Sequence, residues 1–125
     1  MSNGKATILI VDDEVAIREL LRESFFKIDC NVLVAADGRQ ALKTCRETTV
    51  DLVITDLVMP EVEGLEMIQQ LHREFPSIPV IAMSGTFGNL LDAATHFGAV
   101  AVFEKPIDLE ELFKAVRKVL QRKSA

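Results

Sequence analysis

Several acidic, basic and hydroxyl-bearing residues stand at or just beyond the ends of short apolar runs in this sequence. Carboxylates gathered in one place repel one another unless a cation lies between them. An all-oxygen set of ligands of that kind suits Mg²⁺ or Mn²⁺, and one ammonium group adds positive charge without balancing three acids. The residues concerned are Asp12 and Asp13 after Ile8–Val11, Asp56 after Leu52–Ile54, Ser84 after Val80–Met83, and Lys105 after Val100–Phe103.

The apolar runs alternate with segments of helical spacing. Short runs rich in β-branched residues are typical of strands buried on both faces of a parallel sheet, and apolar residues that recur every three or four positions are typical of amphipathic helices. The alternation predicts an α/β domain with a doubly wound five-stranded parallel sheet and helices on both faces. The expected strands are 8–11, 31–36, 52–54, 80–83 and 100–103, and the expected helices lie around 17–28, 41–45, 65–71, 90–94 and 109–120.

Such a sheet would gather the reactive residues at one edge. Right-handed crossovers restrict the order in which the strands can be arranged. In open α/β sheets, binding sites lie outside the carboxyl ends of the strands, where the strand order reverses. We therefore expect the acids, Ser84 and Lys105 to share one site.

The last helix has the clearest local signals. Asp108 can accept a hydrogen bond as its N-cap, and Glu111 stands three residues later, as in a capping box. Ile107 and Leu112 occupy the positions of a hydrophobic staple. We expect Gly98 to close the preceding helix.

Composition narrows the range of functions. The chain has 125 residues and a formal net charge of −5, which suits a single domain and argues against a nucleic-acid-binding surface. Cys30 and Cys45 lack the spacing of a metal site or a redox pair and are expected to be free thiols in a reducing compartment. No apolar stretch approaches the ~18 residues that span a membrane. The expectation is one soluble, cytoplasmic domain over residues 5–122.

The order and spacing of these residues resemble the receiver domains of response regulators. The resemblance rests on Asp12-Asp13 after an apolar strand, Asp56 before Leu57-Val58-Met59-Pro60 and Gly64, Ser84 after the fourth strand, and Lys105-Pro106 after the fifth. It covers nearly the whole chain, and the combination of motifs is far more specific than any one of them. It implies a flavodoxin-like (βα)5 fold with strand order 2-1-3-4-5.

The resemblance also implies how the acids divide the chemistry. Asp56 would accept a phosphoryl group from a histidine kinase or a histidine phosphotransfer protein in a two-component phosphorelay. Asp12, Asp13 and Asp56 would hold Mg²⁺, or Mn²⁺, together with the backbone carbonyl of Val58. Asp13 would be a direct ligand, and Asp12 would act partly through water.

By the same resemblance, Lys105 and the hydroxyl of Ser84 would bind the phosphoryl oxygens, and the Lys105–Pro106 peptide bond would be cis. The phosphorylated domain would act on a downstream protein through its fourth helix, fifth strand and fifth helix, without direct contact with nucleic acid or membrane. It would catalyse only its own phosphorylation and dephosphorylation. A stand-alone receiver and a fragment of a longer regulator both remain compatible with the sequence.

The sequence departs from the family at one switch position. Receivers commonly have Tyr or Phe three residues before the conserved lysine, and this chain has Val102 there. Phe103 cannot substitute for that aromatic residue, because neighbouring residues of a strand point to opposite faces.

Three other interpretations compete with a phosphorylated receiver. A Mg²⁺-dependent phosphatase with an aspartyl nucleophile usually needs a second acid two residues later, where this chain has Val58, and a cap domain for which there is no length. A degenerate receiver that serves only for docking would not need its acids, Ser84 and Lys105. In isolation, Asp13 could also simply cap the first helix.

Overall fold

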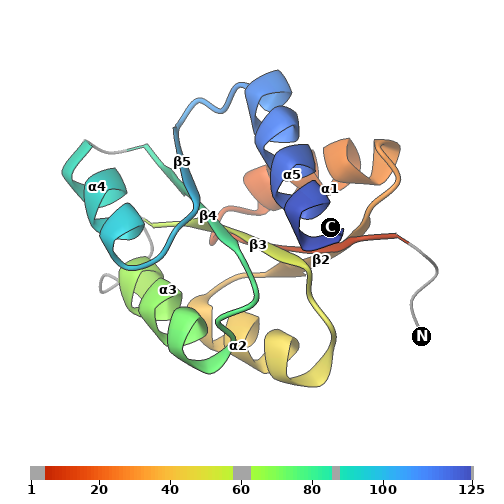
Figure 1. The fold of residues 1–125 in the computed structure, drawn as a ribbon. Coiled ribbons are helices and arrows are strands. Elements are labelled where there is room, and N and C mark those ends of the chain that lie inside the picture. The colour runs from red at the N-terminus through yellow and green to blue at the C-terminus, as the bar shows by residue number, and fades with distance from the viewer. Residues whose placement is uncertain (1–4, 58–62, 86–87, 125) are drawn as a thin grey trace.

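A computed structural model describes residues 5–57, 63–85 and 88–124, in which five strands alternate with five helices (Figure 1). The alternation agrees with the prediction from apolar spacing. In chain order the elements are β1 (Thr7–Val11), α1 (Val15–Lys27), β2 (Asn31–Ala35), α2 (Gly38–Glu47), β3 (Leu52–Asp56), α3 (Glu63–Glu74), β4 (Val80–Ser84), α4 (Gly88–His96), β5 (Ala101–Glu104) and α5 (Leu109–Ser124).

The strands form one parallel sheet with the order β2-β1-β3-β4-β5. The chain moves outward from β1 to β2 and then returns to the other side of β1 to continue with β3. The strand order therefore reverses between β1 and β3, where Leu9 lies beside Val53 in register. The predicted fold class and strand order are confirmed, and the reversal places the expected binding edge at the carboxyl ends of β1 and β3.

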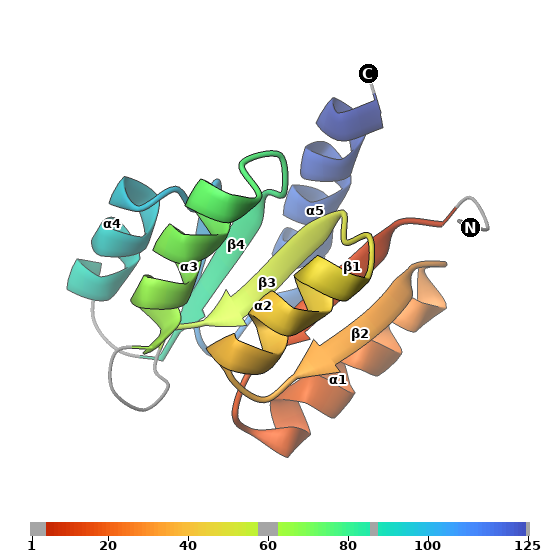
Figure 2. The same cartoon turned by 90° about the horizontal axis from the view of Figure 1, so that it is seen from below.

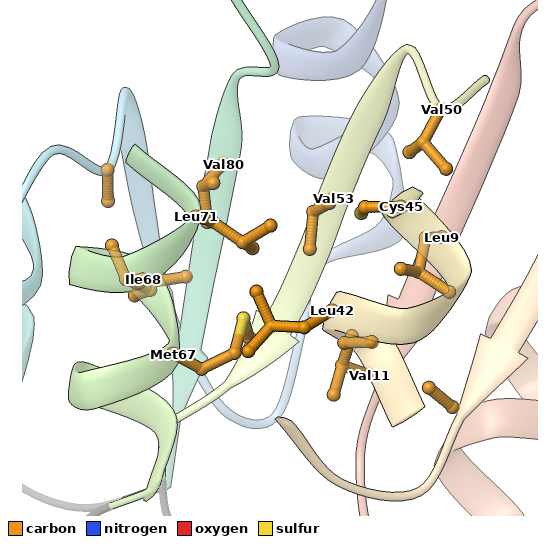
Figure 3. Close-up of a cluster of buried hydrophobic side chains, with 14 of the residues drawn as sticks. Leu9, Val11, Leu42, Cys45, Val50, Val53, Met67, Ile68, Leu71 and Val80 are labelled. Atoms are coloured by element: carbon orange, nitrogen blue, oxygen red, sulfur yellow. The ribbon is translucent and has the colours of Figure 1, made fainter. Parts of the chain in front are cut away.

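One face of the sheet packs against α2, α3 and α4. Figure 3 shows the centre of this cluster, where strand residues such as Leu9 and Val53 meet Leu42 of α2 and Leu71 of α3. Strand residues and helix residues alike are almost completely buried there. Fully burying one such aliphatic side chain stabilises the fold by about 1.5–3 kcal/mol.

The other face packs against α1 and α5. Phe25 of α1 and Phe113 of α5 meet edge to face, with ring centroids 5.1 Å apart. Val102 lies against the α2–α4 cluster, and Phe103 lies against the α1–α5 cluster, as the alternation of strand residues predicted. With helices on both faces, the central strands form a rigid support for the residues at their ends.

Three strands end later than the sequence suggested. β3 continues to Asp56, β4 to Ser84 and β5 to Glu104, whereas the apolar runs predicted ends at Ile54, Met83 and Phe103. The ladder explains the extension, because Asp56 lies opposite Met83 and Ser84 lies opposite Glu104, the last residue of β5. Polar residues thus remain in the sheet where a neighbouring strand still pairs with them.

Local signals at helix ends were read correctly. The Asp108 Oδ1 atom accepts a hydrogen bond of 3.2 Å from the backbone N–H of Glu111 at the start of α5. Ile107 and Leu112 belong to the same apolar cluster. Gly98 follows α4 with φ of +117°, a conformation that favours glycine. None of the helices in the described ranges combines the length and apolar character needed to cross a bilayer.

Candidate functional site

The carboxyl ends of the strands bring the predicted site residues together. Figure 2 shows the strands pointing to the same end of the sheet. Asp12 directly follows β1, Asp56 and Ser84 are the last residues of β3 and β4, and Lys105 directly follows β5. Backbone hydrogen bonds hold this end in place: Asp12 N–H donates to Ala35 O (3.1 Å), and Lys105 N–H donates to Ser84 O (2.8 Å).

Four carboxylates cluster at this end. Asp12, Asp13, Glu14 and Asp56 each offer an oxygen atom, and these atoms all lie within 4.8 Å of one another. Asp12 and Asp56 are buried, with 0% and 2% exposure, whereas Asp13 and Glu14 are exposed. An all-oxygen cluster that is open on one side suits a hydrated divalent cation such as Mg²⁺, which keeps several of its waters. The donor set therefore fits the expected metal.

The Lys105 side chain reaches into this cluster. Its Nζ atom lies 3.0 Å from Asp12 Oδ2, 3.3 Å from Asp56 Oδ2 and 3.8 Å from Glu14 Oε1. Partial burial acts to lower the pKa of the Lys105 ammonium. The hydrogen bond to Asp12 and the negative charges of Asp56 and Asp12 outweigh burial and raise the pKa above its ordinary value. Lys105 is therefore a permanent cation at neutral pH.

The Lys105 side chain lies beside Gly85, the residue that follows β4. The Lys105–Pro106 peptide bond is cis, as the resemblance implied. The Lys105 stem passes close to Gly85, where an added Cβ would lie 3.8 Å from Lys105 Cβ. The ammonium group thus approaches the acids from a well-defined stem.

Asp12 is held by several hydrogen bonds. Its Oδ1 atom accepts a hydrogen bond of 2.9 Å from the backbone N–H of Glu14, and its Oδ2 atom accepts the bond from Lys105. The Arg18 guanidinium of α1 donates to the Asp12 backbone carbonyl at 2.7 Å. Charge-assisted bonds of this kind are the strong ones in proteins, so the β1–α1 connection is held on both its side-chain and main-chain atoms.

The helix-cap interpretation of Asp13 is wrong. The N-cap of α1 is Glu14, whose side chain makes no capping hydrogen bond, and Asp13 lies one residue outside the helix. Asp13 instead contributes its carboxylate to the acidic cluster.

Ser84 is completely buried at the end of β4, beside the connection to Lys105. The Val58 carbonyl, which the resemblance implied as a metal ligand, lies outside the described residues.

Sequence reasoning missed two residues of this site. Glu14 joins the acidic cluster and the Lys105 ammonium, and it could have been found as the continuation of the acidic pair before it. Arg18 binds the Asp12 carbonyl across six positions of the chain. Nothing in the sequence distinguishes it from an ordinary solvated arginine on the first helix.

Comparison with known proteins identifies the family of this chain. The sequence profile of the response regulator receiver domain matches residues 8–117. The chain belongs to this family. The resemblance drawn from the spaced acids, Ser84 and Lys105 is thereby confirmed, and the chain is a receiver domain of two-component signalling.

Relatives of the receiver domain differ in length. Sporulation initiation phosphotransferase F of Bacillus subtilis is 38% identical over 126 aligned positions, which cover 99% of each chain. The transcriptional regulatory protein GlrR of Escherichia coli is 32% identical over 124 positions, which cover 98% of the receiver domain but 28% of GlrR. The receiver domain thus spans the full length of one relative and a minor part of the other.

Solved structures agree with the fold. The signal receiver domain of an HD domain-containing protein from Pseudomonas fluorescens superposes with a TM-score of 0.90 at 27% identity, covering 99% of the receiver domain and 93% of that chain. The response regulator TrrA of Thermotoga maritima, solved in complex with Mg²⁺-BeF, superposes with a TM-score of 0.84 at 31% identity, covering 92% and 99%.

Proposed function

We propose that the receiver domain accepts a phosphoryl group on Asp56 and that this modification switches a protein–protein surface. The observation that carries the proposal is the position of the Asp56 carboxylate, which is buried at the end of β3, lies among three other acids and approaches the Lys105 ammonium at 3.3 Å. An anionic oxygen held beside a cation is arranged for nucleophilic attack on phosphorus.

The reaction is a transfer from nitrogen to oxygen. An Asp56 carboxylate oxygen attacks the phosphorus of a phosphohistidine in line with the departing ring nitrogen. The P–O bond forms as the P–N bond breaks, and the bonding pair returns to the imidazole. The product is an acyl phosphate on Asp56, whose charge is spread over the equatorial oxygens of the phosphoryl group.

Two side chains of the site would then bind the new phosphoryl oxygens. Lys105 carries a positive charge within reach of Asp56, and Ser84 brings a hydroxyl to the end of the neighbouring strand. Both donors are placed near the end of β3 by the sheet before the reaction begins, and donors placed in advance stabilise developing charge with little reorganisation.

We further propose that Asp12, Asp13 and Asp56 hold Mg²⁺, or Mn²⁺ in its place, with the Val58 carbonyl as a fourth protein ligand. When bound, the metal would neutralise phosphoryl oxygens and relieve the repulsion among the acids. The proximity of the carboxylate oxygens supports this assignment, as does the relative TrrA, which was solved with Mg²⁺-BeF. The presence of the acids together with Lys105 and Ser84 supports a phosphorylated receiver over a module that serves only for docking.

The proposed donor is a histidine kinase or a histidine phosphotransfer protein, and the domain extends over residues 5–122. The proposed output surface consists of α4, β5 and α5. Val100, in the connection between α4 and β5, is half exposed. The net charge of −5 disfavours direct binding to nucleic acid. We place the domain in the cytoplasm on the basis of two buried free thiols, and we assign it no turnover beyond its own phosphorylation and dephosphorylation.

Intact-mass measurement tests this function. Acetyl phosphate with Mg²⁺ is expected to add one phosphoryl group to the parent protein, and Asp56→Asn is expected to abolish the addition, because an amide is not an anionic nucleophile. Asp51→Asn provides the matched control, since Asp51 makes its hydrogen bond at the opposite end of the sheet. Undiminished labelling of the Asp56→Asn protein would refute the assignment.

A further inference from the structure

Glu14 lies in the site without a role in the proposed transfer. Its carboxylate is within 4.8 Å of the oxygens offered by Asp12, Asp13 and Asp56. It also forms an ion pair of 3.8 Å with Lys105, although its side chain is 63% exposed. Its backbone N–H donates a hydrogen bond to Asp12 Oδ1, which fixes the position of the Glu14 backbone in the β1–α1 turn.

We propose that Glu14 is a positioning residue that competes for the Lys105 ammonium and adds a fourth negative charge to the site. This inference rests on the proposed function. In the unphosphorylated protein, Lys105 is shared among Asp12, Asp56 and Glu14. For Lys105 to bind a phosphoryl oxygen on Asp56, its contact with Glu14 must weaken.

The charge of Glu14 acts in opposite directions on the two ligands of the site. A carboxylate close to the metal ligands attracts a divalent cation, whether directly or through its water shell. The same carboxylate repels an anionic phosphodonor and shares the Lys105 ammonium that would bind the transferred group. Glu14 thus favours metal loading while slowing phosphorylation.

Both effects should be moderate. Exposed ion pairs contribute little, because water screens them. The Glu14 carboxylate is mostly exposed, whereas Asp12 and Asp56 are buried beside Lys105. Neutralising Glu14 should therefore change each equilibrium or rate by about two- to fivefold, whereas loss of Asp56 should abolish the reaction.

The test is Glu14→Gln, which removes the charge and keeps the shape. The Glu14 side chain makes no capping hydrogen bond, so the variant loses none at the start of α1. Glu23→Gln is the matched control, because Glu23 is an exposed acid on α1, the helix that begins directly after Glu14. It belongs to the pocket around Lys5 and Phe26 instead of this site. MgCl₂ affinity is measured by isothermal titration calorimetry, and the initial rate of labelling by acetyl phosphate is measured by intact mass at saturating Mg²⁺.

We expect Glu14→Gln to bind Mg²⁺ about two- to fivefold more weakly and to be phosphorylated about two- to fivefold faster, while Glu23→Gln matches the parent in both. A merely structural role would not move the two readouts in opposite directions. Any other combination overturns the inference, including a parallel fall in affinity and rate. If the parent protein itself neither binds Mg²⁺ nor becomes labelled, the proposed function fails instead.

Discussion

The two ends of the sheet handle their charges in different ways. At the amino ends of the strands, acids have separate partners: Asp51 Oδ2 accepts from the Thr7 N–H at 2.8 Å, and Asp29 pairs with Lys5 at 3.1 Å. At the carboxyl ends, Asp12, Glu14 and Asp56 share the ammonium of Lys105. At the amino end each of these acids has its own partner, whereas the carboxyl end concentrates negative charge that an additional cation would relieve.

Burial makes this difference consequential. The ion pair between Lys5 and Asp29 is exposed on both sides, and pairs of that kind contribute little to stability. Asp12 and Asp56 are buried, and an uncompensated buried charge is costly. The buried carboxylates at the carboxyl end therefore depend on a nearby cation, whereas the exposed ion pair at the amino end contributes little to stability.

Removal of Lys105 should have the largest effect on stability. We expect Lys105→Met to lower the free energy of unfolding by roughly 3 kcal/mol in metal-free buffer, because two buried carboxylates lose their ammonium partner while the aliphatic stem is kept. Urea denaturation measures the difference. Lys114→Met is the control, since Lys114 pairs with Glu111 on the surface of α5 and should cost less than about 1 kcal/mol.

The pH dependence of that difference follows from the raised pKa of Lys105. Folding raises this pKa above the ordinary 10.5, so the stabilisation is fully present below that value and is lost as pH rises through the folded pKa. The difference between parent and Lys105→Met should thus be constant from neutral pH to near pH 10 and shrink above it. If Lys105→Met and Lys114→Met lowered the free energy of unfolding equally, Lys105 would not have the special role at the carboxyl end that we assign to it.

Magnesium should stabilise the folded protein through the acids at the carboxyl ends of the strands. At a concentration about a hundredfold above its dissociation constant, a ligand specific for the folded state adds about 2.7 kcal/mol, so Mg²⁺ should raise the melting temperature by roughly 10 °C. Asp13→Ala should lose most of this response. Asp51→Asn removes the charge on the acceptor of the Thr7 N–H and should keep the full response to Mg²⁺. Thermal scans in EDTA and in MgCl₂ measure the change in melting temperature. An unchanged melting temperature of the parent protein would contradict the metal site.

The smallest effect should come from the two thiols, which lie outside the acidic site. We expect them to be unreactive in the folded protein. Cys30 and Cys45 are buried and free. Burial, together with the nearby Glu74 charge, raises the pKa of the Cys45 thiol to about 11, and burial raises that of Cys30 as well. Both should react with a disulfide reagent at pH 8 far more slowly in the folded protein than in urea. Rapid reaction of either thiol in the folded state would contradict this expectation.

The support of the site was predictable from the sequence because it follows from local pattern. Apolar runs gave the strands, and strand alternation placed Val102 and Phe103 on opposite faces, as found. The Asp108 cap was equally predictable, because its acceptor and the Glu111 N–H lie three residues apart.

Features that depend on distant partners were not predictable. The extension of β3 to Asp56 requires Met83 as its neighbour on β4. The part played by Glu14 depends on Lys105, which arrives from the far end of the chain. The bond from Arg18 to the Asp12 carbonyl depends on the geometry of the β1–α1 turn, which no spacing rule specifies.

Chemical trapping of the phosphoryl group tests most directly whether Asp56 carries it. Borohydride donates hydride to the carbonyl of an acyl phosphate, expels phosphate and reduces the resulting aldehyde to an alcohol, so a phosphorylated aspartate becomes homoserine. After labelling with acetyl phosphate and Mg²⁺, peptide mass spectrometry should find homoserine at position 56 and unchanged Asp12, Asp13 and Glu14. Homoserine at Asp12 or Asp13, or 5-hydroxynorvaline at Glu14, with Asp56 intact in labelled protein, would contradict the account.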